Sequence, residues 1–290
     1  MEKKIIVIGS GPAGISAALY ARRGGASVTV VTKGQGALAK AERIENYYGF
    51  PEPVTGAELE RRGIEGARRL GITLQSGEVM QLGFNDTFDG YTVAGKDFEL
   101  SAPSVILAAG ASRKSVQIPG IAELEGKGVS YCAICDAFFY RKKRVGVIGA
   151  GAYALHEAEV LAPHVSELHI LTNGAEETAQ FPQGMTVHTS KLSSIKGTEH
   201  VEGVVFEDGA ELPLDGVFIA IGTAGSVVLA KKMGIQLEGR SVKVDDNMAT
   251  NVPGIFAAGD CTGGLLQVAK AVYEGAKAGL SAVNYLRSKS

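Results

Sequence analysis

The chain has 290 residues with 45% apolar and 21% charged side chains, which are values of a globular protein long enough for two domains. A formal net charge of −2 argues against a globally basic nucleic-acid-binding protein, and three cysteines are too few for a secreted domain built on disulfides. No apolar run reaches the length of a membrane span and no signal peptide precedes the first strand, so we expect a cytoplasmic protein that binds neither membrane nor nucleic acid.

The N-terminal segment carries a dinucleotide-binding fingerprint. An apolar run, Lys4–Ile8, leads into the G-x-G-x-x-G turn of Gly9–Gly14. A helix is predicted over Ile15–Arg22 and a second strand over Ser27–Thr32. A lone glycine motif is weak, but this strand–turn–helix–strand context makes the prediction of a nucleotide-binding domain strong.

The three glycines have separate expected roles. Gly9 permits the tight turn, Gly11 lets a pyrophosphate approach the backbone, and Gly14 lets helix and strand pack closely. The helix N-terminus then faces the phosphates. The acid that commonly holds a ribose at the end of the second strand is missing, because Thr32 and Lys33 stand there. The adenosine ribose must therefore be held in another way.

The chain continues with less specific signals. Ile44–Pro51 is a turn-rich loop, and a helix is predicted from about Gly56 to Leu70. Weak strands around Val79–Leu82 and Tyr91–Val93 fit a small β meander. The predicted helix carries four arginines on one broad face, which more often marks a solvated face than a docking site: Arg61, Arg62, Arg68 and Arg69.

The segment Ser130–Tyr140 holds two cysteines at Cys-x-x-Cys spacing. A disulfide between Cys132 and Cys135 would cross-link almost no chain, so the pair is more readily a redox couple than a structural staple. Ser130 can cap a helix that places Cys132 in its first turn, where the helix dipole would stabilise a thiolate. Asp136 could exchange protons with the sulfurs, or it could be only a carboxylate favoured by the first turn.

A zinc site is the weaker interpretation of these cysteines. Zinc wants four ligands, and outside the pair only Cys261 and five histidines remain, with no second Cys-x-x-Cys. We therefore expect no metal. Cys261 is expected to be a single buried small residue that needs no function.

The second half of the chain repeats the first. The segment from Arg144 to Thr172 matches the N-terminal unit without a gap, and the strand patterns Val105–Gly110 and Val217–Gly222 form a second matching pair. The aligned positions are Lys4 with Arg144, Gly9 with Gly149, Gly11 with Gly151, and Thr32 with Thr172. Two such features in the same order indicate a duplicated nucleotide-binding fold.

The C-terminal part returns to the first domain. Val242–Val244 precedes a buried strand that ends in Gly259-Asp260, and a helix rich in small residues is predicted over about Leu265–Arg287. The expected fold class is thus α/β, with two Rossmann-like three-layer nucleotide-binding domains. The first is discontinuous, and the second is inserted between about Arg113 and Arg240.

These features together resemble the low-molecular-weight thioredoxin reductases across essentially the whole chain. The run around the cysteines is the most specific, and it lies where that family has it, just before the second fingerprint. The matching segments are Gly9–Gly14, Ile44–Gly49, Ala108–Ser112, Gly128–Tyr140 and Ala257–Asp260. The resemblance implies a homodimeric enzyme that reduces thioredoxin.

The resemblance also implies roles for the two domains. Residues 1–112 and 241–290 would bind FAD, and residues 113–240 would form the central redox-disulfide domain with a degenerate NAD(P)H-binding fold. Cys135 would face the flavin, Cys132 would attack the substrate disulfide, and Asp136 would be the acid–base group. The implied cofactor-binding residues are Gly9, Ser10, Gly11, Pro12, Ala13, Gly14, Thr32, Lys33, Asn46, Val79, Ala109, Gly110, Asp260, Gln267 and Val268.

The second domain departs from the family's NADPH site. The family clamps the 2′-phosphate with a His-Arg-Arg run and a further arginine, whereas here the strand is followed by Thr172–Glu177 without a cation. No arginine or lysine lies between Arg144 and Lys191, and Tyr153 would compete for space at the turn. Leu266 also replaces the arginine that usually precedes the glutamine against the flavin.

These departures are similar to those of the ferredoxin-dependent flavin thioredoxin reductases, in which reduced ferredoxin supplies single electrons to FAD. Because ferredoxins are generally acidic, the basic turn Arg141–Arg144 is the densest candidate docking patch, although such a turn is more often only solvated. One alternative is an NADH-dependent thioredoxin reductase in which Glu176 or Glu177 reaches a ribose diol, and another is an NADPH-dependent enzyme. A dithiol oxidase of the same fold and a flavin-bearing redox sensor also remain open.

Overall fold

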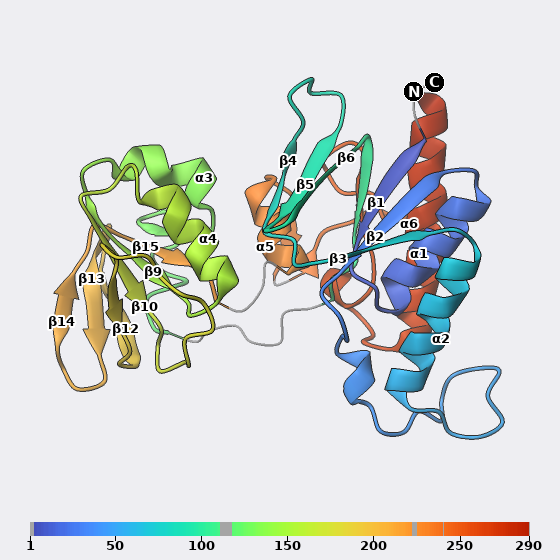
Figure 1. Cartoon of the computed structure of the whole chain (residues 1–290), viewed down its shortest axis with the longest axis horizontal. Helices are drawn as coiled ribbons and strands as arrows, with labels where there is room; N and C mark the ends of the chain where they lie inside the picture. The colour runs from blue at the N-terminus through green and yellow to red at the C-terminus, as the bar shows by residue number, and fades with distance from the viewer. Residues whose placement is uncertain (1–2, 111–117, 222–224, 240, 290) are drawn as a thin grey trace. The chain divides into compact units, whose positions relative to one another are not determined.

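The computed structural model describes residues 3–110, 118–221, 225–239 and 241–289 (Figure 1). The chain divides into two compact units, residues 1–113 with 224–290 and residues 114–223. Within the described ranges, no helix is long and apolar enough to cross a membrane.

A five-stranded parallel sheet forms the centre of the first unit, in the order β18-β7-β1-β2-β3. Short apolar runs form its central strands, and β7 is buried along its whole length, as expected for a sheet covered on both faces. The bounds are β1 Lys4–Ile8, β2 Ser27–Thr32, β3 Thr73–Ser76, β7 Ser104–Leu107 and β18 Ile255–Ala257. A second, antiparallel sheet contains β4 Gln81–Phe84, β5 Tyr91–Gly95 and β6 Phe98–Ala102.

Close backbone packing joins two helices of this unit, α1 and α6, which lie side by side (Figure 1). A Cβ atom added to Gly275 would lie 2.1 Å from the carbonyl oxygen of Ala13, and one added to Gly279 would lie 2.3 Å from that of Ala17. Only glycine permits this approach.

The helices of the unit are α1 Pro12–Arg23, α2 Gly56–Arg69, α5 Ser226–Lys232 and α6 Val268–Ser288. The unit also contains the 3₁₀ turns η1 Leu38–Lys40 and η3 Asp260–Thr262 and a short hairpin of β16 Leu237–Glu238 and β17 Ser241–Val242.

The second unit repeats this plan. Its parallel sheet has the order β11-β10-β9-β15-β8, and its antiparallel sheet the order β12-β13-β14. The strands are β8 Val129–Ser130, β9 Arg144–Ile148, β10 Glu167–Leu171, β11 Thr186–His188, β12 Leu192–Gly197, β13 Val201–Phe206, β14 Glu211–Pro213 and β15 Gly216–Ile219. The helices are α3 Ala133–Asp136 and α4 Ala152–Leu161, with the 3₁₀ turn η2 Ala137–Tyr140.

The predicted α/β fold with two Rossmann-like domains is confirmed. In both parallel sheets the first strand of the fingerprint lies between the second strand and the strand of the later matching pair. The sequence did not predict the second antiparallel sheet. Parts of two predicted patterns, residues 111–112 and Gly222, lie outside the described residues.

The chain returns to the first unit earlier than expected. The predicted boundary residues 112–113 and 240 lie outside the described ranges, but the first unit already includes the chain from residue 224 onward. Helix α5 explains this difference, because the Ser226 hydroxyl accepts the N–H of Ala109 at 3.0 Å. Lys232 Nζ also donates to the Met80 carbonyl at 3.3 Å.

The two fingerprints differ in one internal hydrogen bond. In the first unit, Ser10 Oγ and Thr32 Oγ1 lie 2.6 Å apart. The aligned residues of the second unit are Ala150 and Thr172, so the hydroxyl that would pair is absent. Thr172 Oγ1 is buried and has no hydrogen-bond partner among the described residues. The second turn has thus lost a polar contact that the first retains.

This difference predicts opposite responses to the same substitution. Thr32→Val should lower the free energy of unfolding by about 1 kcal/mol, because it leaves the Ser10 hydroxyl without its partner. Thr172→Val should be neutral or slightly stabilising, because it removes a buried group that makes no hydrogen bond. Denaturant unfolding of the two variants tests this, and equal losses of stability would contradict it.

Candidate active site

The two cysteines of the Cys-x-x-Cys motif form a disulfide with Cα atoms 5.4 Å apart. Helix α3 begins directly after Cys132, and Cys132 Sγ accepts the N–H of Cys135 at 3.2 Å. The expected capping by Ser130 is therefore wrong, because Cys132 itself is the N-cap and does not lie in the first turn. The N–H contact still favours negative charge on the Cys132 sulfur once the disulfide opens.

Ser130 instead links the cysteine segment to the neighbouring carboxylate. Its hydroxyl accepts the N–H of Cys132 at 3.1 Å and donates to Asp136 Oδ2 at 2.6 Å. This chain of bonds holds one carboxylate oxygen in a fixed place and leaves the other available. The pKa of the nearby Tyr140 phenol is raised by burial and, to a smaller extent, by the charge of Asp136.

A buried glutamate, which the sequence analysis missed, anchors the same helix. Glu157 on α4 is 1% exposed, and its Oε2 accepts the N–H of Ala133 at 2.7 Å. It fixes the first residue of α3 to α4. Its spacing could have revealed it, because Glu157 lies four positions from both Tyr153 and Leu161 and therefore shares their buried face of α4.

The surface next to the disulfide is apolar and aromatic. Cys132 is buried, whereas Cys135 is exposed. Ile134, Phe138 and Phe139 are 49%, 68% and 69% exposed, which is unusual for such large apolar side chains. This surface suits contact with another molecule.

The first fingerprint has the features of an anion-binding turn. No side chain caps the N-terminus of α1, and Pro12 occupies its first turn, so the N–H groups of this turn are available to a ligand. A Cβ added to Gly11 would meet nothing within 4 Å. This open cradle fits the pyrophosphate of a dinucleotide.

The predicted cofactor-binding residues gather in the first unit, at the edge where its parallel strands end. Gly9 to Gly14 follow β1, Thr32 ends β2 and Lys33 follows it, Ala109 and Gly110 follow β7, and Asp260 follows β18. Residues far apart in sequence also meet there, because Asn46 Nδ2 donates to Gln267 Oε1 at 3.1 Å, next to Val268 at the start of α6. Lys33 pairs with Glu78 at 3.2 Å, and Val79 is buried beside that pair.

A second carboxylate was missed in this region. Glu60 on α2 is 6% exposed, and its Oε1 accepts the N–H of Gly36, in the loop after β2, at 3.1 Å. Its Oε2 has no hydrogen-bond partner among the described residues. It places an unsatisfied acceptor beside the loop where the expected ribose-binding acid is absent. Its position on a helix remote in sequence hid it from motif analysis.

The second fingerprint is covered by its own chain. A Cβ on Gly151 would lie 3.1 Å from Thr178 Oγ1, and the N–H of Thr178 donates to the Ala150 carbonyl at 2.8 Å. The loop after β10 therefore folds onto the turn. Tyr153 is not the obstacle that the sequence suggested, because its ring is buried inside the unit and its hydroxyl donates to the Tyr131 carbonyl at 3.4 Å.

Lys191, which lies later in the chain, brings a positive charge to the loop after β10. The stem of Lys191 packs against Gly174, since a Cβ there would lie 2.7 Å from Lys191 Cγ. A single lysine thus reaches a loop that also contains Glu176 and Glu177. Across the described ranges, no group of three or more histidine, cysteine, aspartate or glutamate residues is arranged to hold a metal ion.

Comparison with known proteins identifies the family of this chain. The model of the family described as pyridine nucleotide-disulphide oxidoreductase matches residues 3–275. Thioredoxin reductase of Aquifex aeolicus (strain VF5) is 34% identical over 306 residues, which cover 98% of this chain and 94% of that protein. Thioredoxin reductase of Bacillus subtilis (strain 168) is 32% identical over 304 residues, which cover 97% and 94%.

Two solved structures are similar over nearly their whole length. The atypical thioredoxin reductase TRi from Desulfovibrio vulgaris Hildenborough is 39% identical, with a TM-score of 0.92 and 99% of both chains covered. A ferredoxin-flavin thioredoxin reductase from Clostridium acetobutylicum is 32% identical, with a TM-score of 0.79 and 98% of both chains covered. The resemblance to thioredoxin reductases is thus confirmed, and with it FAD as the cofactor that the open turn of the first unit fits. The chain belongs to the pyridine nucleotide-disulphide oxidoreductase family, among the thioredoxin reductases.

Proposed function

We propose that this flavoprotein passes electrons through FAD to the Cys132–Cys135 disulfide and on to thioredoxin, and that reduced ferredoxin is the donor. The observation that carries the choice of donor is the contrast between the two fingerprints. The space at Gly11 is open, whereas Thr178 fills the corresponding space at Gly151. A pyridine nucleotide would have to displace the loop after β10 to place its pyrophosphate there.

Charge adds to this steric argument. A 2′-phosphate is usually held by bidentate arginine contacts, which are strong charge-assisted bonds. The loop after β10 carries Glu176 and Glu177, and the stem of Lys191 packs against Gly174 of this loop. NADH lacks the 2′-phosphate and so escapes the charge argument, but it meets the same covered turn. The similarity to the ferredoxin-flavin enzyme of Clostridium acetobutylicum supports the same donor.

The chain's own residues handle the disulfide chemistry. Bound FAD accepts electrons singly or in pairs and so can couple a one-electron donor to a two-electron disulfide. Opening the disulfide takes two electrons and releases two sulfurs, of which one can remain a thiolate while the other takes up a proton. The N–H of Cys135 stabilises a thiolate at Cys132, which suits Cys132 as the nucleophile toward thioredoxin. Asp136, held by Ser130, gives and takes the proton.

The cations of the turn that follows η2 provide a docking surface for an acidic electron carrier. Arg144 is already neutralised, since its Nε lies 3.6 Å from Asp215 Oδ2. The other three cations of the basic turn remain exposed, namely Arg141, Lys142 and Lys143. A cavity of about 420 Å³ beside it is lined in part by Lys127 and Lys143, which extends the positive surface.

The arginine face of α2 is the poorer candidate for this docking. Arg61 and Arg62 both lie 2.7 Å from Glu58 Oε1, and these hydrogen bonds lower the pKa of Glu58 to about 2. These charges are engaged within the helix.

We also propose that the enzyme is cytoplasmic, as expected from its sequence, and that it is a homodimer, as the resemblance to thioredoxin reductases implies.

The donor is tested by anaerobic flavin bleaching. NADPH should leave the yellow protein oxidised over minutes, whereas an excess of pre-reduced ferredoxin over flavin should bleach it and support thioredoxin reduction. NADH should also fail, because it meets the covered turn. Rapid bleaching by micromolar NADPH followed by thioredoxin reduction would refute the choice of donor.

The same assay tests the docking surface. Reversal of two charges in Arg141→Glu/Lys142→Glu should slow ferredoxin-driven bleaching by about tenfold at low salt and weaken its salt dependence. The matched control Arg68→Glu/Arg69→Glu reverses two exposed charges on α2 and should have a small effect. Equal effects of the two variants would remove the basic turn as the docking surface and leave the donor untouched.

Asp136→Asn should slow turnover with thioredoxin by roughly 10²–10⁴-fold, because the amide cannot exchange a proton. Ser130→Ala removes one hydrogen bond to the carboxylate and should cost about 1 kcal/mol, or roughly fivefold in rate. Asp208→Asn alters an exposed carboxylate in the turn between β13 and β14 and serves as the control. Steady-state turnover measures all three, and an Asp136 variant as fast as the control would reduce Asp136 to a helix-end residue.

A further inference from the structure

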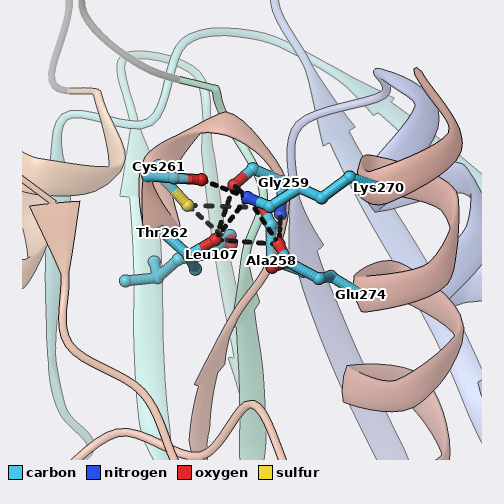
Figure 2. A network of polar contacts seen from close by, with 8 residues as sticks. Leu107, Ala258, Gly259, Cys261, Thr262, Lys270 and Glu274 are labelled. Carbon is cyan, nitrogen blue, oxygen red and sulfur yellow. Dashed lines mark hydrogen bonds and ion pairs between the residues drawn. The ribbon is translucent and has the colours of Figure 1, made fainter. Parts of the chain in front are cut away.

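A lysine and a glutamate of α6 hold the turn that follows β18 (Figure 2). Lys270 Nζ and Glu274 Oε2 lie 2.9 Å apart, and the two side chains are only 14% and 12% exposed. The turn contains Gly259, whose φ of 86° is a conformation that favours glycine, followed by Asp260 in η3. The pair therefore borders the part of the first unit that leads into the cofactor-binding edge.

The pair contacts the turn from both of its charged ends. Glu274 Oε2 accepts the N–H of Gly259 at 2.8 Å, while Lys270 Nζ donates to the Gly259 carbonyl at 2.8 Å (Figure 2). Lys270 also donates to the Gly263 carbonyl at 2.6 Å and to Thr262 Oγ1 at 2.8 Å. One ammonium group thus holds the backbone on both sides of η3, and Asp260 lies between these two attachment points.

The helix that carries the pair is itself fixed against the first fingerprint. A Cβ on Gly275 would lie 2.1 Å from the Ala13 carbonyl oxygen, and one on Gly259 would lie 2.7 Å from Ala13 Cβ. The turn, α6 and the first turn of α1 therefore form one closely packed block. A shift of the turn would change the distance between Asp260 and the open N-terminus of α1.

A buried ion pair is weak evidence for stability alone, because desolvation offsets much of its attraction. Here the pair does something more specific, since its hydrogen bonds converge on a single five-residue stretch, 259–263, and define one backbone conformation. Asp260 is half-buried, and within the described residues its carboxylate makes no hydrogen bond, so its oxygens can accept from a ligand.

We propose that Lys270 and Glu274 are positioning residues for FAD, which hold Gly259 and Asp260 against the first turn of α1 so that both face one ligand. Neither side chain needs to touch the cofactor. This role rests on FAD as the cofactor of the chain and is independent of the electron donor, so that failure of the donor proposal would leave it unchanged.

Cys261 shares the turn but has a different part in it. Its thiol lies 3.3 Å from the Ala258 carbonyl and 3.5 Å from that of Leu107 (Figure 2). Burial raises the pKa of this thiol to about 11, so it stays protonated at neutral pH. It packs beneath the turn as a small buried residue, as expected from the sequence.

The test compares FAD release from holoprotein carrying Lys270→Met or Glu274→Gln. Because the chain has no tryptophan, release is followed through the flavin's own fluorescence after dilution and ultrafiltration. Each variant should raise the dissociation constant for FAD by about tenfold or more, as expected when a binding turn loses its defined position. Lys270→Arg, which keeps the charge and the donors, should retain more affinity than Lys270→Met.

Lys277→Met is the matched control, since Lys277 lies on the same helix over the ring of Tyr273, 5.7 Å from its centroid. It should leave FAD release unchanged. Thermal unfolding with and without FAD separates positioning from general stabilisation, because positioning variants should shrink the rise in melting temperature that FAD causes. FAD affinity within twofold of the parent, or an unchanged rise in melting temperature, would overturn the proposal. If Lys270→Met does not fold, Glu274→Gln alone decides it.

Discussion

The structure depends on a close approach between the end of one strand and the turn after another, which only glycine allows. A Cβ on Gly9 would lie 2.4 Å from the Ala108 carbonyl oxygen, and one on Gly149 would lie 2.2 Å from that of Ala220. The same constraint therefore operates in both units and places the N-terminus of a helix at the edge of each parallel sheet.

The two copies share this glycine contact but differ in the residues that surround each turn. The first turn keeps its Ser10–Thr32 hydrogen bond and open space at Gly11, whereas the second has Ala150, an unpartnered Thr172 hydroxyl and Thr178 over Gly151. In the second unit, helix α4 instead supports the redox pair, because Glu157 on α4 accepts the N–H of Ala133, the residue after Cys132. Duplication thus supplied two scaffolds, of which we propose that one holds FAD and the other presents a disulfide.

Local pattern and glycine spacing predicted much of this architecture. The second strand, Ser27–Thr32, agrees residue for residue, and the duplication follows from aligned glycines that must recur wherever the same turn recurs. Contacts between side chains remote in sequence were not predictable in this way. Ser130 was expected to cap α3 but bonds Asp136, Lys191 reaches a loop from which it is separated by a strand, and the Lys270–Glu274 pair shows no motif. The early return to the first unit was missed because it rests on Ser226, a buried serine without a periodic signal.

We propose that the covered second turn does not bind a pyridine nucleotide, and direct binding tests this without relying on turnover. Calorimetric titration of the oxidised protein with NADPH isolates binding from electron transfer. We expect no saturable binding of NADPH below about 1 mM, so its binding free energy should be weaker than about 4 kcal/mol. A dissociation constant in the low micromolar range would contradict it.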